Sequence, residues 1–241
     1  MPQDVPPYEG LAPFYDHAMR HVDYGEWAGY LGQLFARFDC RPASVVDLAC
    51  GTGSISFQLR AIGLPVTCGI DGSPAMVTIA RERALRAGQL IQFEVRDLRD
   101  LGMLGPYGAA ICMYDSLNYL LEIDEVVACL EAVHAGLEPG GLFVFDVCTE
   151  RNSLRYFRQF REREAGPGFA YQRHGYYDAA SRMQMNDFVI HREGHRTPLH
   201  EMHRQRIYRL DEIDAAIEQT PLERLAAFDG FTFAPGSEEA D

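Results

Sequence analysis

Two glycines stand shortly after an aspartate in a pattern that suits a ligand-binding loop. Gly51 and Gly53 follow Asp47 by four and six residues. Because glycine has no side chain, a ligand can approach the backbone of such a loop closely. A carboxylate at Asp47 would repel a phosphate and attract an ammonium or sulfonium group. The loop therefore favours a ligand that carries a positive charge.

The spacing of these glycines differs from two common nucleotide-binding loops. The dinucleotide motif G-x-G-x-x-G requires a third glycine where this chain has Ser56. A P-loop requires Gly-Lys-Ser/Thr, and no such triplet follows the glycines. An NAD-dependent oxidoreductase is therefore disfavoured. A glycine turn without a ligand remains the structural alternative.

A second aspartate lies at the spacing expected for a contact with ribose. Asp71 stands twenty residues after Gly51 and ends the apolar run 65–70. Its two acceptor oxygens match two adjacent hydroxyl donors. A structural role is also open, because Ser73 and Pro74 suit the start of a helix at this point. A third aspartate, Asp97, ends the next apolar run.

The elements that must position these acids alternate between buried strands and amphipathic helices. Strands are expected at 44–48, 65–70, 90–96, 109–114 and 142–147, and helices at 26–38, 54–62, 74–87 and 124–135. This alternation predicts an α/β fold with a doubly wound, mostly parallel sheet. In such a sheet ligands bind at the carboxyl ends of the strands, which would gather the three aspartates near one site.

The run Asp47-Leu48-Ala49-Cys50-Gly51-Thr52-Gly53, with the acids after it, resembles the first motif of class I S-adenosylmethionine (SAM) dependent methyltransferases. The layout looks most like small bacterial stand-alone methyltransferases of undefined substrate and the N-methyltransferases of nucleotide-linked amino sugars. The resemblance implies that SAM is the cofactor. It places the following residues at the cofactor: Tyr15, Asp47, Ala49, Gly51, Gly53, Asp71, Gly72, Met76, Asp97, Leu98, Tyr114 and Asp115.

The resemblance also implies individual roles. Tyr15, in a Tyr-Asp pair, would lie in an N-terminal lid near the methionine carboxylate of SAM. Met76 would face the adenine ring, whose amino group Asp97 would bind, and the Leu98 amide would serve a ring nitrogen. The loop from Asp115 would end beside the sulfonium.

Few residues are candidates for work on the methyl acceptor. In-line transfer from a sulfonium needs alignment and exclusion of water, and a base only where the acceptor carries a proton. His203 is one candidate base, because it shares one face of an expected strand with Glu201 and Gln205. Tyr119 is another by its position after the fourth strand. Asn118, Tyr119 and His203 are therefore expected at the acceptor, although a solvated polar strand remains the alternative reading of His203.

The chain after residue 150 departs from the strand–helix alternation. A short helix with Leu154, Phe157 and Phe160 is expected, followed by a three-stranded antiparallel insertion at 169–177, 183–191 and 198–210. We divide the chain into lid helices at 1–40 with a loosely held arm over 1–13, a SAM-binding core at 41–150, the β insertion or cap at 151–210, and a return to the core at 211–241.

The end of the chain predicts one further strand, within Leu222–Phe233, and no seventh strand is evident. Three explanations stay open: a truncated chain, a sheet without that strand, or a strand supplied by a partner such as a second copy in a homodimer.

Composition restricts the partners. The 241 residues carry a formal net charge of −13, and the pI is about 5.0. An acidic surface argues against nucleic acid and against anionic membranes. No apolar run is long enough to cross a bilayer, and the N-terminus has no signal-peptide pattern. We therefore expect a cytoplasmic protein with six free cysteines, no metal site and a small-molecule acceptor.

Three hypotheses about function follow. The first is a methyltransferase that acts on an O or N atom of a small molecule. The second is an RNA methyltransferase that uses the arginines between Arg151 and Arg163, which Glu162 and other acids dilute. The third is a SAM-binding regulatory module without catalysis, which would show a blocked acceptor pocket.

Overall fold

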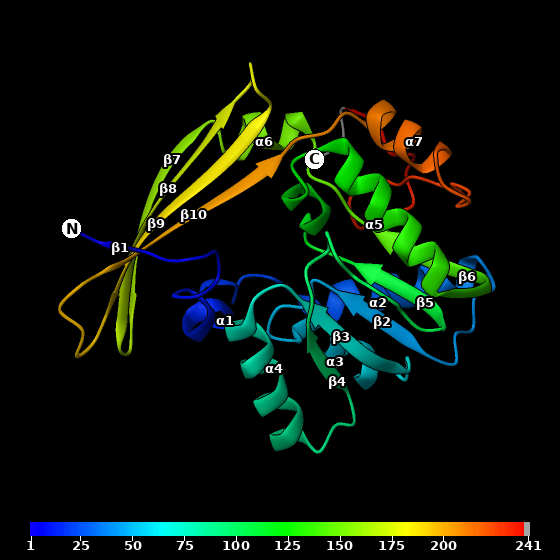
Figure 1. The fold of residues 1–241 in the computed structure, drawn as a ribbon, viewed down its shortest axis with the longest axis horizontal. Helices are drawn as coiled ribbons and strands as arrows, with labels where there is room; N and C mark the ends of the chain where they lie inside the picture. The colour runs from blue at the N-terminus through cyan, green and yellow to red at the C-terminus, as the bar shows by residue number, and fades with distance from the viewer. Residues whose placement is uncertain (239–241) are drawn as a thin grey trace.

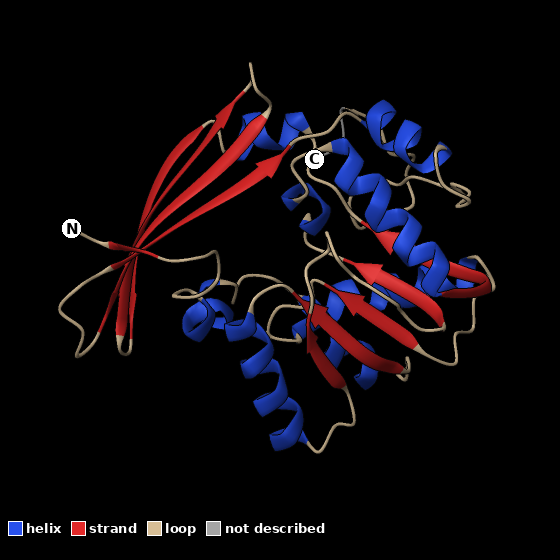
Figure 2. Cartoon of the chain, viewed as in Figure 1, coloured by secondary structure: helices blue, strands red, loops and turns tan. Residues whose placement is uncertain are grey.

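The computed structural model describes residues 1–238 and contains two separate five-stranded sheets (Figure 1, Figure 2). One sheet is parallel throughout, with strand order β4-β3-β2-β5-β6. Its strands are β2 (Val45–Leu48), β3 (Val66–Asp71), β4 (Gln92–Val95), β5 (Tyr107–Cys112) and β6 (Leu137–Phe145). All four residues of β2 are buried, as expected of a central parallel strand. The predicted α/β fold with a doubly wound sheet is confirmed.

Helices cover both faces of this sheet. One face packs against α2 (Tyr24–Arg37), α3 (Ser54–Ala61) and α4 (Pro74–Ala87), and the other against α5 (Ile123–Gly136) and α7 (Leu210–Glu218). Leu59 and Leu130 are fully buried, one on each face, and such a side chain stabilises the fold by about 1.5–3 kcal/mol. Ser73 caps α4 by accepting the Met76 N–H at 3.3 Å, so its structural role is real.

The second sheet is antiparallel except at its edge, with strand order β1-β10-β9-β8-β7. It follows α6 (Glu150–Tyr156) and consists of β7 (Gln159–Gly166), β8 (Phe169–Asp178), β9 (Met183–Arg192) and β10 (Leu199–Arg206), with the short β1 (Gln3–Asp4) at one edge. The prediction of three antiparallel strands was wrong, because β7 is a fourth. The spacing of Phe160 from Phe157 favours a helix, but the ladder with β8 makes this segment a strand.

The N-terminal arm, residues 1–13, is held firmly, contrary to the prediction of a loose arm. Strand β1 pairs in parallel with β10, and the fully buried carboxylate of Glu201 accepts the backbone N–H groups of Tyr8, Gly10 and Leu11. The arm then leads through a 3-10 turn (Ala12–Phe14) into α1 (Tyr15–Ala18). The residue that anchors the arm lies about 190 residues away along the chain, so the local pattern could not reveal it.

A histidine between two carboxylates fixes the outer end of the arm. His200 lies 2.6 Å from Asp4 and 2.8 Å from Asp187, and the pKa of His200 is raised, first through the hydrogen bond to Asp4. A raised pKa in the folded state stabilises the arm fully below the ordinary histidine pKa, and this contribution is lost as the pH rises through the folded-state value.

We therefore expect proteolysis of the arm to accelerate between about pH 6 and about pH 9, beyond the protease's own pH response. In His200→Gln the arm should be cleaved at the same rate at both pH values. In His195→Gln, which changes an exposed neighbour, the difference in cleavage rate should persist. An equal pH response in His200→Gln and the unmodified protein would contradict this role.

The segment after α7 does not extend the parallel sheet. Within residues 219–238 the only β pairing is an isolated antiparallel bridge between Phe228 and Pro235, so the predicted strand at Leu222–Phe233 was wrong. Its aromatic side chains pack on α2 instead: Phe231 stacks on Trp27 with ring centroids 4.4 Å apart, and Tyr30 donates a 2.6 Å hydrogen bond to the Thr232 carbonyl. Over the described residues the parallel sheet ends at β6.

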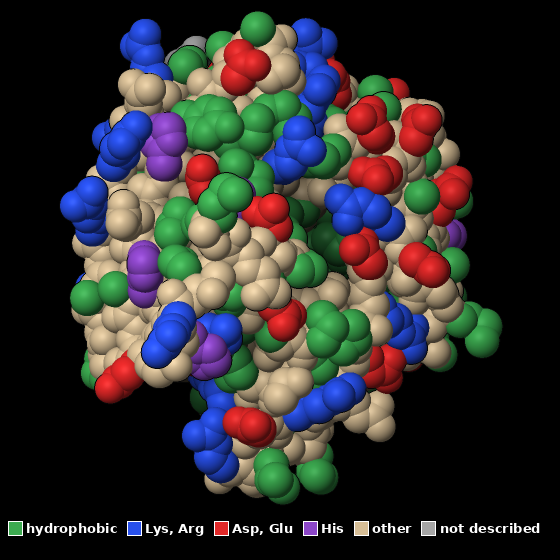
Figure 3. Space-filling model, turned by 60° about the vertical axis from the view of Figure 1, so that its left-hand side comes forward, with side chains coloured by type: hydrophobic (Ala, Val, Ile, Leu, Met, Phe, Trp, Pro, Cys, Tyr) green, Lys and Arg blue, Asp and Glu red, His purple; other side chains and the backbone are tan. Residues whose placement is uncertain are grey.

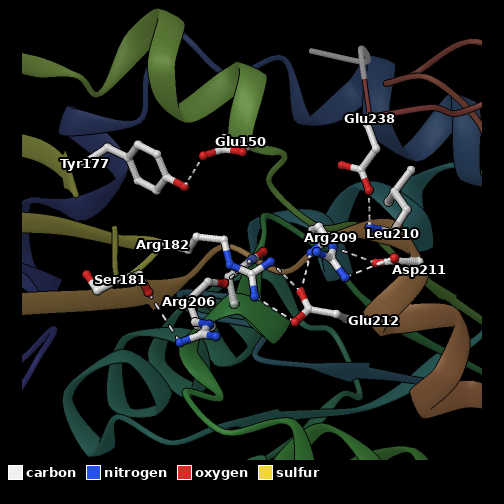
Figure 4. A network of polar contacts seen from close by, with 11 residues as sticks. Glu150, Tyr177, Ser181, Arg182, Arg206, Arg209, Leu210, Asp211, Glu212 and Glu238 are labelled. Atoms are coloured by element: carbon white, nitrogen blue, oxygen red, sulfur yellow. Dashed lines mark hydrogen bonds and ion pairs between the residues drawn. The ribbon is translucent and has the colours of Figure 1, made fainter. Parts of the chain in front are cut away.

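An ion pair connects the antiparallel sheet to α7 (Figure 4). Arg182, in the β8–β9 turn, donates two hydrogen bonds of 2.6 and 2.7 Å to Glu212 in the first turn of α7. Two parallel bonds between guanidinium and carboxylate fix orientation as well as distance. The pair therefore holds one end of the antiparallel sheet over the parallel sheet, and β10 runs from the arm to that end (Figure 1).

Candidate active site

The glycine loop between β2 and α3 presents an open backbone. Gly51 and Gly53 have φ of +55° and +81°, which glycine adopts without strain. A Cβ built on Gly51 would meet no atom within 4 Å, whereas one on Gly53 would lie 3.0 Å from Phe57 and Phe93. Gly51 therefore leaves space for a ligand against the loop, and Gly53 is required for packing. Ala49 precedes them, also with a left-handed φ of 54°.

Asp71 joins two loops at the carboxyl edge of the sheet. Its Oδ2 accepts the Gly51 N–H and its Oδ1 accepts the Ser73 N–H, each at 2.8 Å. Burial raises the pKa of Asp71, although the two N–H donors oppose that shift. A carboxylate offers about four lone-pair positions, so both oxygens can still accept a ligand hydroxyl.

Asp47 lies below the glycine loop. Its side chain is 1% exposed and accepts a hydrogen bond from the Ser56 hydroxyl, and burial raises the pKa of Asp47 to about 7. A group so deeply buried supports the loop from beneath. Because Asp47 presents no exposed carboxylate, the prediction that it attracts a cationic ligand directly is not supported.

The other residues expected at the nucleoside lie beside Asp71. An ideal Cβ on Gly72 would stand 3.7 Å from the Asp97 carboxylate, so the ends of β3 and β4 converge. Asp97 itself is exposed and accepts the Arg99 N–H at 2.8 Å. Met76 is 2% exposed and belongs to the core, and Leu98 is half-buried. The edge therefore presents Asp71, Gly72 and Asp97 together, while Met76 lies inside.

A cavity of about 1200 Å³ extends from the end of β5, where the antiparallel sheet lines it, along β6 to α2, α7 and the segment after α7. Figure 3 shows a hollow with hydrophobic side chains inside and charges of both signs around it. Of the predicted site residues, the cavity brings together Tyr15, Tyr114, Asp115, Tyr119 and His203. The residues of the glycine loop and the Asp71 edge are not among its lining residues, so the site has two parts.

Asn118 does not join this cavity. It is fully buried, its amide donates to the Arg206 carbonyl at 2.7 Å, and its oxygen accepts the Cys148 N–H at 2.9 Å. The side chain therefore ties the loop after β5 to the end of β10 and to the segment after β6. The expected contact between Asn118 and the acceptor is not supported by this position.

Two carboxylates face each other at the cavity. Asp115 follows Tyr114, and both have left-handed backbones with φ of 47° and 66°, conformations that cost free energy and cluster at functional sites. Asp146, at the end of β6, accepts the Asp115 N–H at 3.1 Å through Oδ2. Burial raises the pKa of Asp115 to about 7 and that of Asp146 to about 6.

Asp146 was missed in the sequence, although it lies at the carboxyl end of the fifth strand, as Asp71 does at that of the second. Its Oδ1 is buried and has no hydrogen-bond partner among the described residues. A buried acceptor without a donor is costly, so this atom indicates a place for a donor that a ligand or a water molecule supplies.

His203 lies in a row of polar groups beside the cavity. Its Nε2 is 3.1 Å from Glu201 and its Nδ1 is 3.0 Å from the Tyr119 hydroxyl. The Tyr119 hydroxyl lies 2.7 Å from that of Tyr8, which also lines the cavity. The structure thus brings the two predicted candidates, His203 and Tyr119, into contact, and adds Tyr8 and Glu201.

Comparisons with known proteins agree with this layout. Residues 45–141 match the family model described as "Methyltransferase domain". "Putative methyltransferase YqeM" of Bacillus subtilis (strain 168) is 30% identical over 215 residues, which cover 88% of this chain and 84% of that protein. The chain belongs to the SAM-dependent methyltransferases.

Two further comparisons describe relatives within this family. A dTDP-3-amino-3,6-dideoxy-alpha-D-glucopyranose N,N-dimethyltransferase of Streptomyces fradiae is 32% identical over 58% of this chain and 54% of its own length. The crystal structure of a SAM-dependent methyltransferase from Clostridium acetobutylicum ATCC 824 superimposes with a TM-score of 0.81 at 20% identity, over 97% of this chain and 95% of that one. The latter likeness concerns the fold.

In this methyltransferase α1 contacts the glycine loop. Asp16, next to Tyr15 in α1, accepts a 2.6 Å hydrogen bond from the Thr52 hydroxyl and pairs with Arg83 of α4 at 3.0 Å. Arg83 also donates to the Thr52 carbonyl at 3.0 Å. These contacts connect α1, whose Tyr15 lines the cavity, to the glycine loop.

Arg83→Leu is expected to weaken binding of S-adenosylhomocysteine (SAH) about fivefold, because a partly exposed ion pair contributes at most about 1 kcal/mol. Isothermal titration measures the change. Arg86→Leu, one turn away and more exposed, is the matched control and should bind SAH as the unmodified protein does. Equal affinities of the two variants for SAH would show that the contact between Arg83 and Asp16 has no role in binding.

Proposed function

We propose that this methyltransferase transfers the methyl group of SAM to an O or N atom of a small molecule held in the cavity at the end of β5. The observation that carries the proposal is that one cavity is lined by the lid, by the loop after β5 and by the antiparallel sheet. A volume of about 1200 Å³ exceeds the range of about 300–1,000 Å³ that is typical of small-molecule sites, so the cavity has room for a small-molecule acceptor. The Streptomyces fradiae relative, named for an amino-sugar substrate, supports an acceptor of this size class.

The residues present fit SAM. The open face of Gly51 accommodates a ligand against the backbone, and Asp71, Gly72 and Asp97 would hold the nucleoside at the ends of β3 and β4. Tyr15 and Tyr114 would enclose the methionine part from the lid and from the end of β5. When bound, SAM supplies a methyl group that its sulfonium already activates. The protein's task is therefore alignment and exclusion of water.

The acceptor would lie among side chains of mixed character. Aromatic rings of Tyr8, Trp27 and Phe188 line the cavity, as do the polar groups of Asp115 and Arg173. Mostly apolar walls with a few fixed polar groups are typical of sites for small metabolites. We infer that the polar groups orient the acceptor and that the rings keep water out.

The two other hypotheses receive less support. On β7 the exposed Arg161 and Arg163 share one face of the strand, since Glu162 and Glu164 point to the other, but two arginines on a chain of net charge −13 make only a small basic surface for RNA. A regulatory module without catalysis would show a filled acceptor pocket, whereas the cavity is open. Within residues 1–238 no helix is long and apolar enough to cross a bilayer.

Isothermal titration with SAM, SAH and NAD tests the cofactor. We expect SAM and SAH to bind and NAD to give no heat of binding. A screen with methyl-labelled SAM against amines, hydroxylated metabolites and RNA then tests the acceptor, and label should pass to a small molecule. Transfer to RNA alone would refute the proposed acceptor class, and binding of NAD without SAM would refute the proposed function.

A further inference from the structure

Four polar side chains from three distant parts of the chain form one hydrogen-bonded row, and three of them, Tyr8, Tyr119 and His203, line the cavity. We propose that Glu201, His203, Tyr119 and Tyr8 are a proton relay, and that the Tyr8 hydroxyl is the catalytic group that takes the proton of the methyl acceptor. The inference rests on the proposed function and deepens it. It assigns a chemical role to the N-terminal arm, which carries Tyr8.

The hydrogen bonds of Glu201 fix the direction of the row. Its carboxylate accepts the N–H groups of Tyr8, Gly10 and Leu11 and can only accept when ionised. The His203 Nε2 at 3.1 Å must therefore carry a hydrogen and donate it to Glu201. The Nδ1 lone pair of His203 then faces the Tyr119 hydroxyl at 3.0 Å and accepts its hydrogen.

The same reasoning fixes the direction of the hydrogen bonds of the two tyrosines. Because Tyr119 donates to His203, its oxygen accepts the hydrogen of Tyr8 across 2.7 Å. The Tyr8 oxygen keeps its lone pairs for a donor in the cavity that it lines. Every hydrogen in the row points away from the cavity and toward Glu201, so the cavity end can receive a proton.

Packing keeps the row in place. His203 is 2% exposed, and its ring meets those of Tyr8, Phe188 and Tyr119 at centroid distances of 4.6, 5.2 and 6.2 Å. The groups against it are thus Glu201 on its own strand, Tyr119 after β5, Tyr8 on the arm and the uncharged Phe188 on β9. Glu201 is the one charged group among them, and it compensates an imidazolium at His203.

The tyrosines pass protons on without storing charge. Burial raises the pKa of Tyr8 and that of Tyr119, which disfavours a resident phenolate at either position. As the bond between the acceptor atom and the methyl carbon forms and the carbon–sulfur bond breaks, the acceptor proton moves to Tyr8. The Tyr8 proton moves to Tyr119, and the Tyr119 proton moves to Nδ1 of His203. SAH leaves with a neutral sulfur, and the positive charge that SAM brought ends on His203 beside Glu201.

This route specifies the class of acceptor. The attacking atom must carry a hydrogen that is lost on methylation, as in a hydroxyl group or in a primary or secondary amine. A tertiary amine or a thioether has no such proton and gains nothing from the relay. Tyr8 is then a catalytic residue, and Glu201 is a positioning residue that acts through His203.

Nitrogen NMR on the full-length protein with ¹⁵N-labelled histidine rings tests the geometry without an acceptor, in the presence of SAH. We expect His203 to be protonated at Nε2 and unprotonated at Nδ1. Tyr119→Phe should shift the Nδ1 resonance strongly, and Tyr8→Phe should shift it less. Tyr156→Phe, on the exposed surface of α6, should leave it unchanged. A hydrogen on Nδ1, or an Nδ1 resonance that ignores Tyr119→Phe, would overturn the relay.

Kinetics with the acceptor found by the labelled-SAM screen test the chemistry. Tyr8→Phe and Tyr119→Phe should lower kcat about a hundredfold, within the range of general base catalysis, while the Kd for SAH stays unchanged. An unchanged kcat in Tyr8→Phe would refute its catalytic role. The two proposals fail separately: loss of the relay leaves SAH binding intact, whereas absence of SAM and SAH binding refutes the proposed function itself.

Discussion

Asp71→Ala is expected to weaken binding of SAM and SAH about a hundredfold. The carboxylate accepts N–H groups from both cofactor loops at 2.8 Å and is the acceptor we assign to the ribose hydroxyls. A hydrogen bond to a charged group contributes about 1.5–3 kcal/mol, and about 1.4 kcal/mol corresponds to a tenfold change in Kd. Loss of the ribose contacts and of the link between the loops therefore amounts to about two powers of ten.

Titration calorimetry with SAH measures this effect, and circular dichroism verifies that the variant is folded. Asp100→Ala, three residues beyond Asp97 and exposed, is the matched control and should bind normally. The affinity of Asp71→Asn for SAH should lie between those of Asp71→Ala and Asp100→Ala, because its amide retains one acceptor oxygen. A folded Asp71→Ala that binds SAH as tightly as Asp100→Ala does would remove Asp71 from the cofactor site.

Glu201→Ala is expected to lower the free energy of unfolding by about 3–5 kcal/mol. The fully buried carboxylate accepts three backbone N–H groups of the arm, and it lies 3.1 Å from Nε2 of His203, which donates to it in the proposed relay. Its removal leaves these buried donors without a partner, and each such group costs about 1–3 kcal/mol. Since the donors lie on the arm and on β10, the arm should detach before the rest of the molecule unfolds.

Urea denaturation measures the loss, and limited proteolysis within residues 1–13 reports the arm separately. Glu9→Ala, on the same arm but exposed, should have the stability of the unmodified protein and a protected arm. Because Glu201→Ala could yield too little folded protein, Glu201→Gln serves as a second variant. If the arm is protected from proteolysis as well in Glu201→Gln as in Glu9→Ala, the Glu201 carboxylate does not anchor the arm.

The local pattern of the chain determined the cofactor half of the molecule. Strands such as β2 and β3 are short and buried, each is followed by a helix, and the acid at the end of β3 stands at a fixed distance from Gly51. In a parallel α/β sheet this order decides which loops meet at the carboxyl edge. Asp71 could therefore be placed from its spacing alone.

The acceptor half could not be predicted in the same way. Tyr8, Tyr119 and His203 meet across sequence separations of 111 and 84 residues, and neither the period of a strand nor that of a helix reports such a contact. Strand β7 was missed because only its pairing with β8 distinguishes it from a helix. The strand expected at Leu222–Phe233 failed for the converse reason, because its aromatic residues find partners on α2.

The sequence by itself thus determined the fold class, because the alternation of strands and helices follows from short-range periodicity, and its motifs carried the resemblance to the family that the comparisons show. Only the tertiary structure decided that Tyr8 of the arm lines the cavity, that Asp146 has an oxygen without a partner among the described residues, and that His203 lies 3.1 Å from Glu201. Burial and the direction of a hydrogen bond depend on groups brought together from distant segments, so they exist only once the chain has folded.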